Sequence, residues 1–293
     1  MSDSKIQASA DYWDEHNRAP SEDVTYWLSV LDIRRRVNRL LTDDPDTLYI
    51  QHFIDSFRDR WPVDRVLSVG CGIGELERGV AGQDAARHVD GIDVSPASLA
   101  EAARLAADQG LSDAIHYHRA TATEWLGSTG RSYDLVFFHG VLHHLEHLEE
   151  ILALAGSSVQ GGEPGLIYID EYCGPSRDEW TDAHLEIAER FFQRVAADDR
   201  RTPHVWPPIA IEDPTEMIRS SDIEGTVRRE LEIVEYRPYW GNVVMPLINA
   251  IRASRLGRYT DLLIEAWDEE MRLAATGAFE KPLYAAFVAA HKG

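Results

Sequence analysis

One short segment constrains the fold of this chain more than any other: an apolar run that ends in three alternate glycines. Residues 66–69 (Val-Leu-Ser-Val) are typical of a buried β-strand, and Gly70, Gly72 and Gly74 follow. Glycines let a backbone turn sharply and approach a ligand closely, because a Cβ would block both. Helix-forming residues come next, so the segment predicts a strand–turn–helix unit that holds a cofactor.

Strand-like and helix-like segments alternate along the rest of the chain. Helices are expected at 96–109, which Ser95 caps and Pro96 starts, and from about Val141 to Leu154. Such alternation implies right-handed crossovers and a parallel sheet with helices on both faces. The predicted fold class is therefore α/β, a doubly wound seven-stranded mostly parallel sheet. Besides 66–69, strands are expected at 88–94, 115–119, 133–138, 166–169, 231–236 and 283–289.

Helical segments lie outside the expected sheet. Residues 1–62 are expected to form an N-terminal helical cap, since apolar residues recur there at helical spacing. Residues 63–293 are expected to form the core, with helical insertions at about 175–225 and 240–277. Loops that follow the carboxyl ends of parallel strands normally build the site of such a fold, so the insertions are expected near it.

The charge balance argues against a nucleic-acid partner. Among 293 residues, 29 are Lys or Arg and 50 are Asp or Glu, which gives a net charge of −21. Such a field repels a phosphate backbone, and the arginines at 34–39 are interpreted as a solvated helix face. The two cysteines, Cys71 and Cys173, indicate neither disulfides nor a zinc site. Since no apolar run is long enough for a bilayer, a cytoplasmic protein without a membrane partner is expected.

Glu75 decides which cofactor the glycine turn predicts. Counted from Gly70, the dinucleotide fingerprint Gly-x-Gly-x-x-Gly has its third glycine at position 75, where this chain has an acid that repels pyrophosphate. A ligand without phosphates therefore fits better. Asp93 ends the next expected strand about 20 residues further on, where an acid accepts hydrogen bonds from ribose hydroxyls. The alternative role for Asp93 is a helix cap, but Ser95 already supplies that cap.

Together these blocks resemble the class I S-adenosylmethionine-dependent methyltransferases. The glycine turn at 69–74, Asp93 and the block 133–144 match the motifs of that family, and the resemblance covers about residues 65–172. It implies an antiparallel seventh strand and S-adenosyl-L-methionine as the cofactor, laid across the ends of the first four strands. The cofactor-binding residues that it implies are Ser68, Gly70, Cys71, Gly72, Gly74, Asp93, Val94, Thr121, Ala122 and His139.

Two positions depart from the family pattern. Ser68 stands where the family usually has an acid near the cofactor's amino group, and Glu75 or a water molecule are the candidates to replace it. Thr121 stands where the family often has an Asp at the adenine amino group, and its hydroxyl is still able to accept one hydrogen bond. These departures predict weaker binding of the cofactor rather than a different one.

The predicted reaction is transfer of the methyl group to an O, N or C atom of a small-molecule acceptor. In-line displacement needs alignment and, for O–H or N–H⁺ acceptors, a base such as an imidazole or a carboxylate. The block that base-modifying relatives use to hold a flipped base is absent after the fourth strand, where residues 138–141 read Phe-His-Gly-Val. The candidate catalytic residues are His143, His144, Glu171 and Tyr172.

Other interpretations remain open at this point. The same pocket suits cyclisation or cleavage of the cofactor, or a regulatory module that binds it without catalysis. His139, His143 and His147 recur at four-residue spacing, but no metal site is expected because His139 precedes the helix and hard-cation ligands are lacking. Tyr12 or Trp13 is expected to form part of a lid, and a homodimer is a further expectation.

Overall fold

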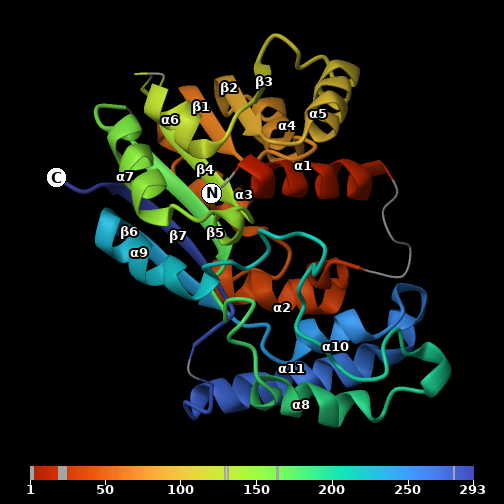
Figure 1. Ribbon diagram of the computed structural model, residues 1–293. Helices are drawn as coiled ribbons and strands as arrows, with labels where there is room; N and C mark the ends of the chain where they lie inside the picture. The colour runs from red at the N-terminus through yellow and green to blue at the C-terminus, as the bar shows by residue number, and fades with distance from the viewer. Residues whose placement is uncertain (1–2, 19–24, 129, 131, 163–164, 280) are drawn as a thin grey trace.

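The computed structural model describes residues 3–18, 25–128, 130, 132–162, 165–279 and 281–293. A seven-stranded sheet crosses the molecule in the order β3-β2-β1-β4-β5-β7-β6 (Figure 1). Strands β1 to β5 are parallel, and β7 runs antiparallel to β5 and β6. The predicted α/β fold class, with its antiparallel seventh strand, is confirmed. The strands are β1 (Val63–Val69), β2 (Ala86–Asp93), β3 (Ile115–Arg119), β4 (Leu135–His139), β5 (Leu166–Tyr172), β6 (Leu231–Tyr239) and β7 (Tyr284–His291).

Helices cover both faces of this sheet. Alternate residues of β4 show the division, since Phe137 belongs to one apolar cluster and Phe138 to the other. Helices α6, α7 and α9 bury side chains in the second cluster, and most of the others contribute to the first. The helices are α1 (Asp3–Arg18), α2 (Leu31–Thr42), α3 (Tyr49–Ser56), α4 (Glu75–Gly82), α5 (Pro96–Asp108), α6 (Ala122–Ser128), α7 (Leu148–Val159), α8 (Asp182–Phe192), α9 (Ile223–Glu230), α10 (Val244–Ala250) and α11 (Thr260–Ala275).

The N-terminal helices divide between two places. Helix α1 packs against α5, whereas α2 packs against β6 and α11 (Figure 1). Helix α3 buries Phe53 against Phe137 and Tyr168 of the sheet, with ring centroids 6.2 and 5.1 Å apart. The late insertions meet each other, because α8 packs against α10 and α11. Helices α2 and α3 of the region 1–62 thus pack against the sheet or α11, and α1 is the helix of this region that is placed to cover a site.

The helix predicted from about Val141 to Leu154 is wrong at its start. Residues 142–144 form a single 3₁₀ turn, and α7 begins at Leu148. The Glu171 carboxylate accepts the backbone N–H groups of Val141 and Leu142 at 2.8 and 2.5 Å. The segment after β4 is therefore held by a residue of β5, and the local sequence does not predict this contact.

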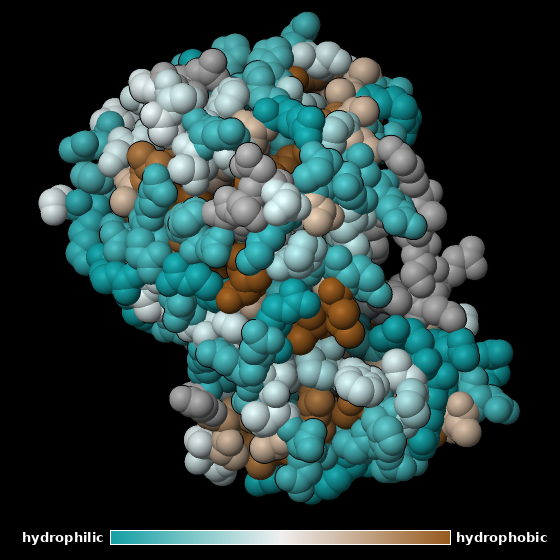
Figure 2. Space-filling view, in the orientation of Figure 1, coloured by the Kyte–Doolittle hydropathy of each residue, from teal (hydrophilic) through white to brown (hydrophobic). Residues whose placement is uncertain are grey.

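The surface agrees with the acidic composition. Figure 2 shows a largely hydrophilic face, with apolar residues gathered mainly in its middle, above the helices α8, α10 and α11. No helix among the described residues combines the length and the apolarity that a bilayer crossing needs.

Glu270 fixes the chain between β6 and α10. Its side chain is fully buried in α11, and its two carboxylate oxygens accept the backbone N–H groups of residues 241–244 at 2.6 to 3.1 Å. We expect Glu270→Ala to lower the free energy of unfolding by about 3 kcal/mol or more, because it leaves buried donors without an acceptor. Urea denaturation measures this loss. Glu269→Gln, which removes only a surface pair with Arg272, is the matched control and should leave the free energy of unfolding nearly unchanged.

Candidate active site

The glycine turn after β1 has the backbone conformation that the sequence predicts. Gly70, Gly72 and Gly74 have φ angles of 68°, 51° and 76°, a region that L side chains rarely adopt. A Cβ on Gly70 would overlap the Val141 side chain, and one on Gly74 would overlap the Tyr117 hydroxyl. A Cβ on Gly72 would enter open space. The turn therefore needs glycine at its ends for packing, and its centre leaves room for a ligand.

Asp93, at the end of β2, faces this turn. One carboxylate oxygen accepts the Gly72 N–H at 2.9 Å and the other accepts the Ser95 N–H at 2.9 Å. Burial raises the pKa of Asp93, and these N–H groups offset part of the rise. The Ser95 hydroxyl accepts the Ser98 N–H at 3.0 Å, so it caps α5 as predicted. Asp93 is thus fixed beside the turn, while Ser95 takes the capping role.

A cavity of about 600 Å³ opens beside the glycine turn and extends to the segment after β4. Six of the predicted cofactor-binding residues line it, and four do not. The six are Gly70, Gly72, Asp93, Val94, Thr121 and Ala122. Ser68 and Cys71 are buried behind the turn, Gly74 starts α4, and His139 is exposed at the end of β4. The predicted cofactor residues of the turn and of β2 therefore share one cavity wall.

Glu171 holds the segment after β4 instead of facing the cavity. Its carboxylate is buried and, besides two backbone N–H groups of that segment, it accepts the Tyr172 N–H at 2.8 Å and contacts the His143 Nδ1 atom at 2.5 Å. The Tyr172 hydroxyl donates to the carbonyl oxygen of Pro175 at 3.0 Å. Of the candidate catalytic residues, Glu171 and Tyr172 are thus placed to position other groups, and His144 lines the cavity.

His144 is oriented by the segment between α8 and α9. Its Nδ1 atom lies 3.0 Å from the Thr215 hydroxyl, which donates its proton to Asp213 at 2.7 Å. Because that single proton goes to Asp213, the Thr215 oxygen accepts from the His144 Nδ1–H. The ring of Trp13 meets the His144 ring edge to face, with centroids 5.9 Å apart. His144 therefore stands in the cavity with its ring fixed on two sides.

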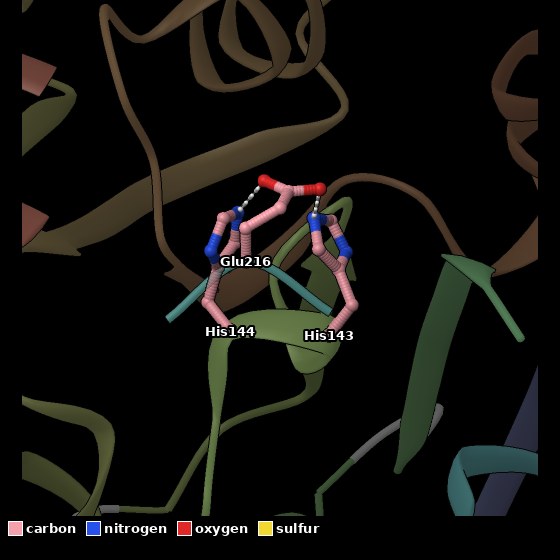
Figure 3. A group of neighbouring side chains, drawn as sticks. All are labelled: His143, His144 and Glu216. Carbon is pink, nitrogen blue, oxygen red and sulfur yellow. Dashed lines mark ion pairs between the residues drawn. The ribbon is translucent and has the colours of Figure 1, made fainter. Parts of the chain in front are cut away.

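Glu216 completes a cluster with the two histidines (Figure 3). Its carboxylate oxygens lie 4.0 Å from the Nε2 atom of His143 and 3.8 Å from that of His144. Burial lowers the pKa of His143, but the carboxylates of Glu171, Glu216 and Asp213 outweigh this effect and raise it to about 9. Burial and the neighbouring His143 hold the pKa of His144 well below its usual value. Glu216 is not predictable from the sequence, since it lies more than 70 residues beyond the histidines in a segment without a motif.

Comparison with known proteins identifies the central segment. Residues 66–160 match a family model described as a methyltransferase domain. They form a class I methyltransferase domain. The resemblance that the glycine turn, Asp93 and the β4 block predict is confirmed, and with it the cofactor of that family, S-adenosylmethionine.

Similar proteins share parts of the chain. A ubiquinone biosynthesis O-methyltransferase from Hahella chejuensis is 34% identical over 113 residues, which are 39% of this chain and 44% of that protein. A protein named probable tocopherol O-methyltransferase, from Oryza sativa, is 28% identical over 184 residues, 61% of this chain and 47% of that one. The chain spans less than half the length of the curated relatives it matches.

A solved structure extends the likeness of fold beyond the methyltransferase domain. The geranyl diphosphate C-methyltransferase of Streptomyces coelicolor superposes with a TM-score of 0.53 and 14% identity, and the match covers 98% of both chains. The helical segments before and after the methyltransferase domain therefore belong to the same overall architecture.

In the methyltransferase domain, Thr121 has a structural role that the sequence analysis missed. Its backbone N–H donates to the Glu124 carboxylate at 3.0 Å and its hydroxyl accepts the Glu124 N–H at 3.2 Å, the reciprocal pattern of a capping box at the start of α6. Glu124 also lines the cavity. The spacing Thr-x-x-Glu was the available signal, and it makes Glu124 an additional candidate for contact with the adenine.

A second acid near the glycine turn was also missed. Glu77, on α4, is 1% exposed, and neither of its carboxylate oxygens has a hydrogen-bond partner among the residues that the structure describes. Burial raises the pKa of Glu77 to about 7, and the neighbouring Ser68 hydroxyl offsets part of the rise. Ser68 is the position where methyltransferase domains usually carry an acid. A buried acid thus lies on the helix behind the turn, near the serine that stands at this position of β1.

Helix α1 covers the cavity of the methyltransferase domain. Trp13 lines the cavity, as the lid expectation requires, and Tyr12 packs edge-on against it with ring centroids 5.3 Å apart. The Ser9 hydroxyl and the Trp13 indole N–H both donate to Asp213, at 3.2 and 3.1 Å. At the other side the Asp14 carboxylate accepts the Ser95 hydroxyl at 2.5 Å. The helix is thus tied to both walls of the cavity.

We expect Asp213→Ala to loosen α1, because it removes the acceptor shared by Ser9 and Trp13. Loss of these bonds should speed amide hydrogen exchange in residues 3–18 by about tenfold or more. Hydrogen-exchange mass spectrometry measures the change. Glu212→Ala, at the exposed neighbouring acid, is the control and should leave α1 unchanged. Equal exchange in the wild type and the Asp213 variant would contradict the tie.

Proposed function

We propose that this protein transfers a methyl group from S-adenosylmethionine to an O, N or C atom of a small-molecule acceptor. The observation that carries the proposal is the single cavity, which joins the glycine turn and Asp93 at one end to Trp13 and His144 at the other. A cofactor and an acceptor bound in one enclosed space meet in a defined orientation. Such alignment alone lowers the barrier of a displacement by several kcal/mol.

The first end of the cavity suits the cofactor. Asp93 would accept the ribose hydroxyls, since an acid at the end of β2 presents its oxygens beside the turn. Gly70 and Gly72 would receive the methionine part, because no side chain fills the space over Gly72. Val94 would pack on the adenine, with Thr121 and Ala122 at its edge. Bound there, S-adenosylmethionine supplies an electrophilic methyl group on a sulfonium.

The second end suits a small acceptor. Apolar side chains there, among them Leu145, Ile151 and Trp13, line it together with His144, and His147, Glu146 and Glu150 add polar groups. The two similar enzymes named above act, by their names, in ubiquinone biosynthesis and on tocopherol, and this supports a small and partly apolar acceptor for this chain. The net charge of −21 supports the absence of nucleic acid. A homodimer and a cytoplasmic location stay predictions from the sequence.

Binding of the cofactor is the first test. We expect the wild type to bind S-adenosylmethionine in calorimetry and Asp93→Ala to bind it about 100-fold more weakly, because two charge-assisted hydrogen bonds are lost. Asp113→Ala, at an exposed acid before β3, is the control. Incubation with a panel of metabolites should then give methylated product and adenosylhomocysteine. Release of methylthioadenosine without methylated product would contradict methyl transfer, and so would binding without turnover of any acceptor.

Glu77 gives the proposal a second test. We propose that its carboxylate pairs with the ammonium group of the cofactor, in place of the acid that methyltransferase domains usually carry at position 68. The support is its burial, its two unpaired oxygens and its position behind the glycine turn. A buried carboxylate without a partner is costly, and a cation that reaches it removes that cost.

We expect Glu77→Gln to weaken binding of S-adenosylmethionine by about tenfold to 100-fold. Adding Ser68→Asp should restore binding, because the acid returns to its usual place. The ligand-free variant should also be more stable than the wild type above pH 7. The folded-state pKa of about 7 lies above the usual 4.5, so Glu77 lowers stability as pH rises between these values, by about 3 kcal/mol in full. Unchanged affinity in Glu77→Gln would refute this role.

A further inference from the structure

Two imidazoles and one carboxylate converge beside the cavity, which one of the three, His144, also lines (Figure 3). His143, His144 and Glu216 each place one ligand atom within 4.8 Å of the others. The Nε2–oxygen distances of 4.0 and 3.8 Å are too long for hydrogen bonds. They are close to the spacing of about 3.3 Å that separates neighbouring ligands around a tetrahedral zinc ion. The three groups thus surround a space of the size of an ion.

The outer nitrogens of both rings are already engaged. The His143 Nδ1 atom contacts the Glu171 carboxylate at 2.5 Å, and the His144 Nδ1–H donates to the Thr215 hydroxyl at 3.0 Å. Such contacts fix the orientation of both rings and turn their Nε2 atoms inward, as in histidines that ligate metals. Because the proton of His144 is on its Nδ1 atom, its Nε2 lone pair faces a Glu216 oxygen across 3.8 Å. Two electron-rich atoms repel each other in this arrangement unless a proton or a metal cation lies between them.

The charge around the cluster points the same way. Three carboxylates that are at most 8% exposed, those of Glu171, Asp213 and Glu216, lie around the two imidazoles. Positive charge near them comes from the His143 ring when it is protonated and from the guanidinium of Arg177, which donates to the Asp213 carbonyl oxygen at 3.1 Å. A divalent cation that displaces the proton of His143 would bring this buried group close to neutrality. Burial of uncompensated charge is otherwise among the most costly features of a fold.

We propose that His143, His144 and Glu216 bind a divalent transition-metal ion of the Zn²⁺ type. Two imidazoles and one carboxylate are a ligand set typical of zinc sites with an open position, and imidazole selects such ions over Mg²⁺ and Ca²⁺. No metal is expected from the sequence, since His139, the first of the three histidines at four-residue spacing, precedes the predicted helix and hard-cation ligands are lacking. The structure leaves His139 and His147 outside the cluster and adds Glu216, which no local pattern connects to the histidines.

An ion at this place leaves a coordination position for the acceptor, since His144 lines the cavity. This role rests on the proposed function, whereas the metal site itself does not. An acceptor hydroxyl bound to the ion loses its proton to water more readily, because the ion stabilises the oxyanion. The site therefore favours a small molecule that carries a hydroxyl group. Its hydroxyl would bind the ion, and its carbon skeleton would contact the apolar wall of the cavity.

Metal binding is tested on the full chain after removal of ions with a chelator. Zn²⁺ binding is followed by calorimetry, and Co²⁺ binding by its visible d–d absorption, which also reports the coordination geometry. We expect one ion per chain, with an affinity for Zn²⁺ and Co²⁺ at least about 100-fold higher than for Mg²⁺. Absence of Zn²⁺ and Co²⁺ binding to the wild type overturns the proposal, and so does equal affinity for Mg²⁺.

Variants locate the ion. Glu216→Gln keeps the shape of the side chain and should lower the affinity for Co²⁺ by at least about 100-fold. Thr215→Val keeps all three ligands and removes the contact that orients His144, so it should lower the affinity by about tenfold to 100-fold. His204→Ala is the matched control, because His204 pairs with a glutamate on the surface. Full affinity in the Glu216 and Thr215 variants would place the ion elsewhere and overturn the proposal.

Cofactor calorimetry on the same samples separates this proposal from the proposed function. Retained metal binding without any binding of S-adenosylmethionine would refute methyl transfer and leave the metal site standing. Binding of the cofactor without binding of Zn²⁺ or Co²⁺ would refute the metal site alone. Thermal melting of each variant in chelator shows whether the protein is folded before the ion is added.

Discussion

Backbone N–H groups in the irregular segments at the carboxyl edge of the sheet need acceptors, because a buried unpaired donor is costly. In this molecule acidic side chains from distant elements supply many of them. Asp93 accepts the N–H of Gly72 across the glycine turn, Glu171 accepts two from residues 141–142, and Glu270 accepts four at the start of α10. Each acid fixes a loop and joins it to another element, and the bonds of Asp93 and Glu171 hold the cavity wall at Gly72 and Val141.

Local signals were sufficient for the parts of the site that a few consecutive residues build. Gly70, Gly72 and Gly74 are needed by the backbone itself, and Asp93 follows one crossover later, so the turn and its acid were predictable from spacing. The parallel strands were predictable for the same reason, since strands buried on both faces are short apolar runs. Strand β6 extends to Tyr239, beyond its predicted end, because pairing with β7 continues through a polar stretch.

The remaining parts of the site depend on contacts between segments that are far apart in the sequence. Residues 141–147 were predicted to be helical, yet Glu171 from β5 holds the start of that segment in a 3₁₀ turn. Asp213 and Glu216 reach the histidines from an irregular segment that carries no motif. Their charge alone did not distinguish them from the other acids of an acidic chain. Only the fold shows that α1, the segment after β4 and the 213–216 segment meet at one place.

The buried acids of this chain fall into two groups, those that accept several hydrogen bonds and those that accept none from the residues described. Glu270 and Glu171 each accept several hydrogen bonds, which is the usual condition for burying a carboxylate. Within the described chain, Glu77 has no hydrogen-bond partner, and Glu216 has two imidazole contacts that are too long to be hydrogen bonds. A fold that buries such groups loses stability unless a ligand compensates them. The two acids flank opposite ends of one cavity, one behind the glycine turn and one beside His144, and each of these places therefore calls for a positive group.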